Sequence, residues 1–268
     1  MSHRTFQRAL VTGASSGIGE QFARLLAERG VATVLVARSA DELGELAADL
    51  RTRHGGTQGG DVEVLAADLL DAADLGRVTD RLRDDDAPVD LLVNNAGAGQ
   101  VGLFADLDVD DAELAVRLNT IVPLRLAHAA LPGLTERGGA ILNVGSVASY
   151  QPVPSMATYA ATKAFMSSWS QALYEELRGT GVTVTALAPG FTRSGFVEAA
   201  EAEEVAARIP GFVWDSPENV AEAGLDGVER GRAVVVPSLL YRVGVTASSM
   251  TPSAITRRVV GEVTRRVR

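Results

Sequence analysis

The clearest indication of the fold in this sequence is the stretch Ala9-Leu10-Val11-Thr12-Gly13-Ala14-Ser15-Ser16-Gly17-Ile18-Gly19. Apolar and β-branched residues run directly into a glycine-rich turn, and a helical pattern begins at Gly17. Glycines at a strand-to-helix turn let the backbone approach a pyrophosphate, which the helix N-terminus attracts through its amides and dipole. The stretch therefore predicts a nucleotide-binding unit, whose cofactor-binding residues are Gly13, Ser15, Ser16, Gly17, Ile18 and Gly19.

Short apolar runs rich in β-branched residues alternate with longer helical stretches along the rest of the chain. The expected strands cover residues 9–12, 32–37, 62–66, 89–93, 140–144, 182–187 and 233–236. The expected helices include residues 17–29, 41–51, 110–131 and 156–178. Continuous apolar strands indicate a sheet covered on both faces, and the alternation with helices indicates parallel strands. We therefore expect an α/β fold of Rossmann type, with a doubly wound, mostly parallel seven-stranded sheet between two helical layers.

The 268 residues suit one large α/β domain, and we expect a single domain over residues 1–268. The regular alternation stops after Gly190, where aromatic side chains fall among acidic and alanine-rich residues. An irregular segment at the carboxyl end of a strand suits ligand binding, so we expect a substrate lid at about residues 191–216. Simple core packing is the alternative for its aromatic residues, which are Phe191, Phe196, Phe212 and Trp214.

Composition and charge exclude several classes of protein and site. The net charge of −9 argues against nucleic-acid binding, because phosphate contacts need clustered Lys and Arg. The sequence has no cysteine, which excludes disulfides, thiolate metal sites and a cysteine nucleophile. His3, His54 and His128 lack metal-ligand spacing, so we expect no metal. Residues 1–7 show no signal-peptide pattern and no apolar run approaches the ~20 residues of a membrane span, so we expect a cytoplasmic protein.

Arginines alternate with apolar residues near the end of the chain, where we expect a helical tail at about residues 238–268. A helix that docks on the domain with a solvated basic face is the simpler interpretation. Peripheral membrane association is the alternative, because basic residues beside apolar ones can lie on an anionic surface.

The second strand ends at Ala37-Arg38-Ser39, nineteen residues after Gly19, where the adenosine ribose of a dinucleotide would lie. A carboxylate there would repel a 2′-phosphate, whereas the planar Arg38 guanidinium matches one. We therefore predict NADP(H) in preference to NAD(H), with Arg38 and Ser39 as cofactor-binding residues. The alternative is that Arg38 is a solvated charge at the end of a strand.

Small and polar residues also follow the third and fourth strands. Asp68, beside Leu69, is placed to meet the adenine edge. Asn94-Asn95-Ala96-Gly97 follows the fourth strand without a gap, and small residues there let the chain pass close to a cofactor. Each segment taken alone could be an ordinary turn, and only their joint order favours a binding site. The predicted cofactor-binding residues here are Asp68, Leu69, Asn95, Ala96 and Gly97.

Tyr159 and Lys163 stand one helical turn apart in Tyr159-Ala160-Ala161-Thr162-Lys163, and Ser146 lies thirteen residues before Tyr159. Residues four apart share a helix face and lie roughly 6 Å apart along the axis. A phenol, an ammonium and a hydroxyl so placed can deliver a proton to a carbonyl. The simpler interpretation of the Tyr–Lys pair alone is an amphipathic helix face, and Ser146 could instead cap a turn.

Taken together, these motifs resemble those of the short-chain dehydrogenase/reductase family. The resemblance runs from about residue 8 to residue 194, and the family's single-domain branch is similar in length. Ser194 stands where many relatives have a second threonine, which keeps the hydroxyl and loses a methyl group. The motifs are Thr12-Gly13-x-x-x-Gly17-Ile18-Gly19, Asn94-Asn95-Ala96-Gly97, Asn119, Ser146, Tyr159-x-x-x-Lys163 and Pro189-Gly190-x-Thr192.

The resemblance implies that Tyr159 is the general acid in carbonyl reduction and the base in alcohol oxidation. It implies that Lys163 binds the nicotinamide ribose and that Ser146 holds the carbonyl oxygen. Asn119 would complete a water-linked proton path to the lysine, and a lone Asn in an apolar helix should have a polar partner. The segment that would close over the nicotinamide carboxamide contributes Pro189, Gly190 and Thr192.

To act as a base near neutral pH, Tyr159 would need a pKa below that of a free phenol. Bringing a phenol from a pKa of about 10 to near 7 requires roughly 4 kcal/mol. A cation about 4 Å away in an effective dielectric of about 20 supplies an interaction of that order. We therefore expect Lys163 to lower the pKa of Tyr159.

The function expected from these features is NADP(H)-dependent interconversion of a ketone or aldehyde and an alcohol. Reduction of 3-oxoacyl groups, steroids or small ketones would all fit. The alternative from another class is a non-catalytic NADP(H)-binding regulatory or sensor protein, although such sensors commonly lose the tyrosine or lysine. Relatives typically associate through the long helices expected at residues 110–131 and 156–178, so we expect a homodimer or homotetramer.

Overall fold

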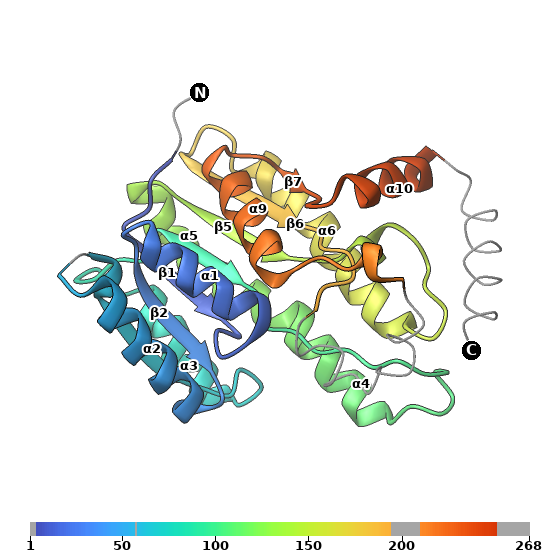
Figure 1. Ribbon diagram of the computed structural model, residues 1–268, viewed down its shortest axis with the longest axis horizontal. Coiled ribbons are helices and arrows are strands. Elements are labelled where there is room, and N and C mark those ends of the chain that lie inside the picture. The colour runs from blue at the N-terminus through green and yellow to red at the C-terminus, as the bar shows by residue number, and fades with distance from the viewer. Residues whose placement is uncertain (1–3, 57, 194–209, 251–268) are drawn as a thin grey trace.

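The computed structural model describes residues 4–56, 58–193 and 210–250. Seven strands form one parallel sheet in the order β3-β2-β1-β4-β5-β6-β7 (Figure 1). The expected fold class is therefore confirmed, and every strand pair in the sheet is parallel. The strands are β1 Arg8–Thr12, β2 Ala32–Ala37, β3 Val62–Ala66, β4 Leu91–Asn94, β5 Gly139–Val144, β6 Val182–Leu187 and β7 Val234–Val235.

Helices cover both faces of the sheet, as the continuous apolar strands require. One hydrophobic cluster joins the sheet to α1 Gly17–Glu28, α2 Ala40–His54 and α9 Pro217–Glu229. The cluster on the opposite face joins it to α3 Ala72–Leu82, α5 Val122–Arg137 and α6 Ala157–Glu176. The remaining α-helices of the described chain are α4 Val109–Val116 and α10 Leu239–Met250.

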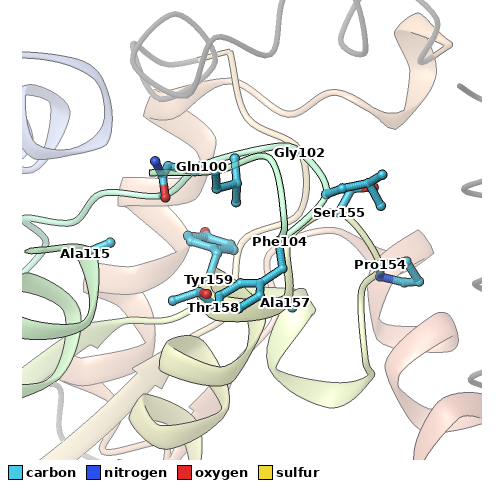
Figure 2. A pocket seen from close by; sticks show the side chains of 12 residues that line it. Gln100, Gly102, Phe104, Ala115, Pro154, Ser155, Ala157, Thr158 and Tyr159 are labelled. Carbon is cyan, nitrogen blue, oxygen red and sulfur yellow. The ribbon is translucent and has the colours of Figure 1, made fainter. Parts of the chain in front are cut away.

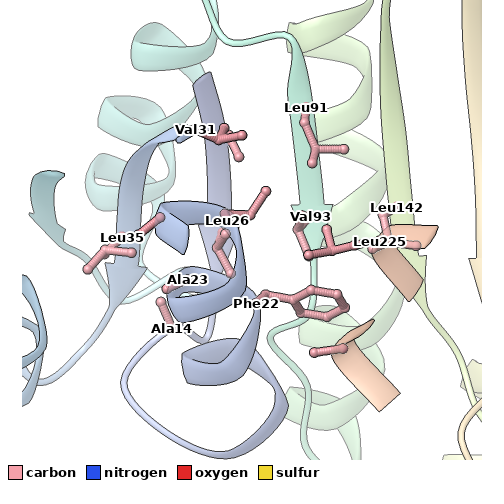
Figure 3. Packing of buried hydrophobic residues seen from close by; sticks show 14 of the residues in the cluster. Ala14, Phe22, Ala23, Leu26, Val31, Leu35, Leu91, Val93, Leu142 and Leu225 are labelled. Atoms are coloured by element: carbon pink, nitrogen blue, oxygen red, sulfur yellow. The ribbon is translucent and has the colours of Figure 1, made fainter. Parts of the chain in front are cut away.

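Phe22 of α1 lies at the centre of the first cluster and is fully buried (Figure 3). Burying a side chain of this size stabilises the fold by about 1.5–3 kcal/mol. Gly224 of α9 makes the close packing possible, because a Cβ there would lie 3.2 Å from Phe22 Cε1 and 2.9 Å from Leu187 Cδ2. Helices α1 and α9 therefore pack on the sheet through an aromatic ring facing a glycine.

The direction of strand addition reverses between β1 and β4. Leu10 of β1 pairs with Val34 on one side and with Leu92 on the other. In an open parallel sheet, ligands bind outside the carboxyl ends of the strands where the order reverses. This places the expected site beyond Thr12 and Asn94, the last residues of β1 and β4.

The boundaries of the elements differ from the sequence-based expectations mostly by one to three residues. The largest difference concerns the helix expected at residues 110–131, which is interrupted by a π-helical turn at Arg117–Ile121 and continues to Arg137. The amide of Val122 donates to the carbonyl of Arg117, five residues earlier, which widens the helix by one residue. Hydrophobic periodicity does not reveal one extra residue in a turn.

The two peripheral segments expected from the sequence are described only in part. Of the lid at residues 191–216, the central part at 194–209 lies outside the described residues, as does the tail from residue 251. Helix α10 begins the tail and extends away from the sheet in Figure 1. None of the helices among the described residues has the length and the apolar character that a membrane span requires.

Candidate active site

The turn after β1 depends on its glycines. Gly13 and Gly17 have φ values of +64° and +58°, a region that favours glycine. At Gly19, a Cβ would lie 2.0 Å from the Gly13 carbonyl oxygen, so only glycine fits. Ser16 is the N-cap of α1, and its side chain accepts no hydrogen bond from the first turn. The first-turn amides of α1 are thus left without a side-chain cap and can bind an anion.

Asn95 and Thr12 hold the turn after β4 against the glycine-rich turn. The Thr12 hydroxyl accepts hydrogen bonds from the amides of Asn95 and Ala96, each at 3.0 Å. The Asn95 Nδ2 donates to the carbonyls of Thr12 at 2.9 Å and Gly13 at 3.2 Å. Thr12 is not among the residues predicted for the site, although it belongs to the first motif, because a β-branched residue at the end of a buried strand normally belongs to the core.

The residues expected at the adenosine end lie after β2 and β3, which are neighbours in the sheet. Arg38 is exposed, and no ion pair joins it to a described residue. The Ser39 hydroxyl caps α2 by accepting from the Glu42 amide at 3.4 Å. Asp68 Oδ1 accepts from the Leu70 amide at 2.9 Å, so this carboxylate also shapes its own turn, while Leu69 is buried.

Asn119 lies in the π-helical turn and is 1% exposed. Its Nδ2 donates to the Ala98 carbonyl at 2.7 Å and to the Thr162 hydroxyl at 3.0 Å, and its Oδ1 accepts from the Ala98 amide at 2.9 Å. The polar partner expected for this residue is therefore present. π-helical turns often occur at functional sites, and this one places Asn119 beside the helix that carries Tyr159 and Lys163.

Ser146, Tyr159 and Lys163 come together at the carboxyl end of β5. A hydrogen bond joins the Ser146 and Tyr159 side chains, and Lys163 Nζ lies 5.6 Å from the centroid of the Tyr159 ring. Ser146 also accepts from the Ala148 amide at 3.1 Å, so it caps a turn as well as contacting the phenol. A Cβ on Gly97 would lie 3.1 Å from Asn119 Oδ1 and 3.5 Å from Lys163 Nζ. All four expected catalytic side chains therefore border one region.

Lys163 is the only lysine in the sequence, and it is 5% exposed. Its Nζ donates to the Val144 carbonyl at 2.9 Å. Burial lowers the pKa of Lys163 to about 8, because a charged ammonium is poorly solvated there. The backbone carbonyl of Lys163 accepts from the Ser149 hydroxyl at 2.8 Å, which fixes this turn of α6 against the strand end.

The expected lowering of the Tyr159 pKa is wrong for this structure. Burial raises the pKa of Tyr159 to about 12, and the hydrogen bond with Ser146 opposes this shift only in part. The Lys163 ammonium points to a backbone carbonyl instead of the phenol oxygen, which explains why desolvation dominates. The sequence spacing alone cannot predict this direction.

The segment from Pro189 to Thr192 is held from two sides. The Pro189 carbonyl accepts from the Val147 amide at 2.9 Å, next to Ser146. On the other side, the Tyr241 hydroxyl of α10 accepts from the Phe191 amide at 3.1 Å. Gly190 lies against the Tyr241 ring, since a Cβ there would lie 1.9 Å from a ring carbon. Thr192 is buried and its hydroxyl donates to the Gly190 carbonyl at 3.2 Å.

A cavity of about 260 Å³ opens beside Tyr159 (Figure 2). It is lined by the loop between β4 and α4, by α4 and by the start of α6, and not by the described residues of the expected lid. Local sequence does not predict this surface, because its residues come from separate loops and helices that only the fold brings together. The lining residues are Gly99, Gln100, Gly102, Leu103, Phe104, Leu107, Ala115, Pro154, Ser155, Ala157, Thr158 and Tyr159.

The residues around the strand ends fit a dinucleotide cofactor. Glycines allow the tight path of the turn from Gly13 to Gly19, and an uncapped helix N-terminus, which can bind a pyrophosphate, follows this turn. Arg38, after β2, would be an exposed cation at the adenosine end of such a cofactor, and Lys163 would be a buried cation at its nicotinamide end. In the part of the chain that the structure describes, no three His, Asp or Glu side chains are grouped to hold a metal.

Comparisons with known proteins agree with this geometry. A family model described as short chain dehydrogenase matches residues 7–205. An uncharacterized oxidoreductase from Staphylococcus epidermidis is 34% identical over 191 residues, covering 71% of this chain and 80% of the relative.

Two solved structures are similar over almost the whole chain. A short-chain dehydrogenase from Sphingobium yanoikuyae in complex with NADPH superposes with a TM-score of 0.81 at 38% identity, covering 91% of this chain and 93% of that one. A bulky-bulky ketone specific alcohol dehydrogenase from Comamonas testosteroni has a TM-score of 0.76 at 35% identity, with coverages of 92% and 96%.

Proposed function

The chain belongs to the short-chain dehydrogenase family, and from that membership we propose that it is an NADP(H)-dependent oxidoreductase interconverting a ketone or aldehyde and an alcohol. One observation carries the proposal: Ser146, Tyr159 and Lys163 meet at the carboxyl end of β5, beside a cavity that a carbonyl substrate can enter. The bound nicotinamide dinucleotide would supply or accept the hydride.

In this proposal, the cofactor lies along the carboxyl ends of β1, β2 and β4. The α1 amides and the residues Gly13, Ser15, Ser16, Gly17, Ile18 and Gly19 would hold its pyrophosphate. Arg38 and Ser39 would bind the ribose phosphate, and Asp68 and Leu69 would border the adenine. The nicotinamide half would lie against Asn95, Ala96, Gly97, Lys163, Pro189, Gly190 and Thr192.

Tyr159 acts as the proton donor when a carbonyl is reduced. With a pKa of about 12, its phenol keeps its proton at neutral pH and can donate to an oxygen that gains negative charge. Ser146 holds the same oxygen through its hydroxyl and so limits the orientation of the substrate. This protonation state favours reduction at neutral pH, whereas alcohol oxidation needs the phenolate and should prefer alkaline pH.

Lys163 and Asn119 support the proton transfer from Tyr159 without contacting the substrate oxygen themselves. The ammonium is the buried cation closest to the Tyr159 ring in the described chain, and it stabilises negative charge left on the phenol after donation. Asn119 is fixed by three hydrogen bonds near Lys163 and would order the water that returns a proton to this pair.

The proposal is tested by following NADPH absorbance with the purified protein and a panel of carbonyl compounds. We expect consumption that depends on both the protein and the carbonyl, with the matching alcohol as the product. If NADPH binds yet no carbonyl of a broad panel is reduced, the activity is refuted and a sensor role takes its place.

Arg38→Asp should reverse the cofactor preference. The guanidinium would lose its charge-assisted bonds to a 2′-phosphate, worth roughly 1.5–3 kcal/mol, and the new carboxylate would repel the phosphate while accepting from a free ribose hydroxyl. We expect the ratio of kcat/KM for NADPH to that for NADH to fall at least about 100-fold. Arg53→Asp is the control, because this exposed arginine lies at the far end of α2 and pairs with Asp49. An unchanged ratio in Arg38→Asp would remove the NADP(H) assignment.

We also propose that the chain forms a homodimer or homotetramer through α4, α5 and α6. Exposed apolar side chains lie along these helices and the π-helical turn between α4 and α5, and such surfaces commonly mark protein interfaces. Light scattering on the purified protein measures the mass directly, and a monomer at micromolar concentration would contradict the proposal. The exposed residues are Leu114, Val116, Ile121, Leu124 and Phe165.

A further inference from the structure

The cavity beside Tyr159 has two facing walls. The first is the loop from Gly99 to Leu107, and the second runs from Pro154 into the first turn of α6 (Figure 2). A backbone hydrogen bond from the Gly102 amide to the Ser155 carbonyl, at 2.9 Å, ties the walls together. Because the walls are joined by main chain, the shape of the cavity does not depend on side-chain contacts alone.

The backbone of both walls is constrained. Ser155 has a φ of +67°, and within the described part of the chain it is the one non-glycine residue with a positive φ. Such a conformation is costly for a residue with a side chain and is found mainly where the surrounding structure enforces it. On the other wall, a Cβ on Gly102 would lie 2.7 Å from Leu107 Cδ2, so Leu107 packs directly over this glycine. The cavity is therefore largely pre-formed.

The cavity has no charged lining residue among those the structure describes. Leu103, Phe104, Leu107 and Ala115 give it an apolar surface, and the phenol of Tyr159 borders it. A carboxylate or phosphate entering this space would lose water without gaining a cation or a dense set of donors. An apolar group would lose only ordered water, which favours binding.

The volume of about 260 Å³ indicates the size of the group that fits. An engineered apolar cavity of about 150 Å³ binds benzene, so this one has room for a substituted ring or a short branched chain. Phe104 is 64% exposed although it borders the cavity, which places its ring at the mouth. A change at Phe104 can therefore alter what enters without removing a buried core residue.

We propose that this cavity binds a bulky, uncharged, apolar substituent of the substrate carbonyl, with Phe104 as a specificity-determining residue at its mouth. The inference rests on the proposed function, because it places the reacting carbonyl at Tyr159 and the substituent in the cavity. It predicts that the protein prefers neutral ketones with a large apolar group over small or anionic carbonyl substrates.

Matched ketones test the proposal on the wild-type protein. Methyl 4-acetylbenzoate and 4-acetylbenzoate share an acetophenone carbonyl and differ in charge, while acetone lacks the large group. We expect kcat/KM for the neutral ester to exceed that for the carboxylate and that for acetone by about 100-fold or more each. Comparable values for the ester and either other ketone would overturn the inference while leaving the carbonyl reductase activity in place.

The variants Phe104→Arg and Val109→Arg distinguish the effect of a charge at the cavity mouth from the effect of the same charge elsewhere on the protein surface. Val109 is 67% exposed at the start of α4 and does not line the cavity, so its variant adds the same charge nearby. We expect the ratio of kcat/KM for the carboxylate to that for the ester to rise at least about 10-fold in Phe104→Arg and at most about 2-fold in Val109→Arg. Equal rises in both variants, or none in Phe104→Arg, would contradict the assignment.

A binding measurement distinguishes failure of the inference from failure of the proposed function. Isothermal titration calorimetry with 4-methylbenzamide and 4-carbamoylbenzoate uses ligands of similar shape that lack a reducible ketone. Tighter binding of the neutral amide, with the difference reduced in Phe104→Arg, supports the cavity even if no ketone is reduced. Equal binding of the two amides overturns it whether or not ketones are reduced.

Discussion

Tyr159→Phe is expected to abolish carbonyl reduction while leaving the fold and NADPH binding in place. The substitution removes one hydroxyl, the one that hydrogen-bonds to Ser146 and that the proposed mechanism uses as proton donor. It keeps the ring that lies 5.6 Å from Lys163 Nζ. General acid catalysis contributes typically ~10²–10⁴-fold, and the oxygen also loses an oriented donor, so we expect kcat to fall at least about 1,000-fold.

The measurement combines single-turnover reduction with NADPH fluorescence. Single-turnover rates report the chemical step, and fluorescence gives the dissociation constant of NADPH without any carbonyl present. Tyr174→Phe is the matched control, because this tyrosine lies on the same helix and its hydroxyl donates to the Gly231 carbonyl at 3.2 Å. We expect the control to change kcat less than about 2-fold. Retention of a tenth of the activity in Tyr159→Phe would exclude the tyrosine as the proton donor.

The order of strands and helices was predictable because burial on both faces makes central strands such as β1, β2 and β4 nearly continuous apolar runs. In β2, for example, the consecutive residues Val34, Leu35 and Val36 are all fully buried. A strand with one solvent-exposed face would instead alternate apolar and polar residues. Most of the candidate cofactor-binding residues could be grouped for a related reason, because they follow the ends of parallel strands, which meet at one edge of the sheet. Asn119, Tyr159 and Lys163 lie within helices, so grouping them depended on the spacing of their motif and on the resemblance to a family.

The cavity and the pKa values could not be predicted from local sequence. Leu103, Phe104 and Leu107 form an apolar wall only because the loop folds back on Ser155, which no periodicity describes. The sequence instead favoured the expected lid as the substrate-binding surface, because its aromatic residues, such as Phe191 and Trp214, are conspicuous among acidic and alanine-rich neighbours. In the structure, these two rings pack on each other with their centroids 5.7 Å apart.

The spacing of Tyr159 and Lys163 in the sequence also led to a wrong prediction for the pKa of the tyrosine. One helical turn between Tyr159 and Lys163 fixes the distance between their backbones, but not the group that the ammonium contacts. The structure directs Nζ to the Val144 carbonyl and buries both side chains enough that desolvation dominates their pKa values. The pKa of the tyrosine thus rises and that of the lysine falls, the opposite of a mutually stabilised pair.

Lys163→Met is expected to lower kcat/KM by about 100-fold or more. In the proposed mechanism, the ammonium lies 5.6 Å from the Tyr159 ring and offsets the negative charge that develops on the phenol only as its proton leaves.

The same change should alter how stability depends on pH. Lys163 has a pKa of about 8 in the folded protein, below the ordinary value of 10.5. Between these values the unfolded chain binds more protons than the native one, so the contribution of Lys163 to the free energy of unfolding rises with pH. Below pH 8 both states are protonated, and burial of the charge costs the native state about 3 kcal/mol.

Urea unfolding of wild type and Lys163→Met at pH 7 and pH 10 measures this contribution. We expect the stability of wild type to rise relative to the methionine variant by about 2–3 kcal/mol over this interval. Tyr159 keeps its proton in the folded wild-type protein over this interval, because its pKa there is about 12. Its titration in the unfolded chain is common to both proteins and therefore cancels from the difference between them.

Because Lys163 is the only lysine in the sequence, its titration can be observed directly. Reductive methylation with ¹³C-formaldehyde labels this side chain and the terminal amine alone, and a matched sample of Lys163→Met identifies the terminal signal. We expect the Lys163 resonance to titrate near pH 8. A midpoint above pH 10, together with parallel stability profiles for the two proteins, would show that the ammonium is solvated and would remove desolvation as the origin of its pKa.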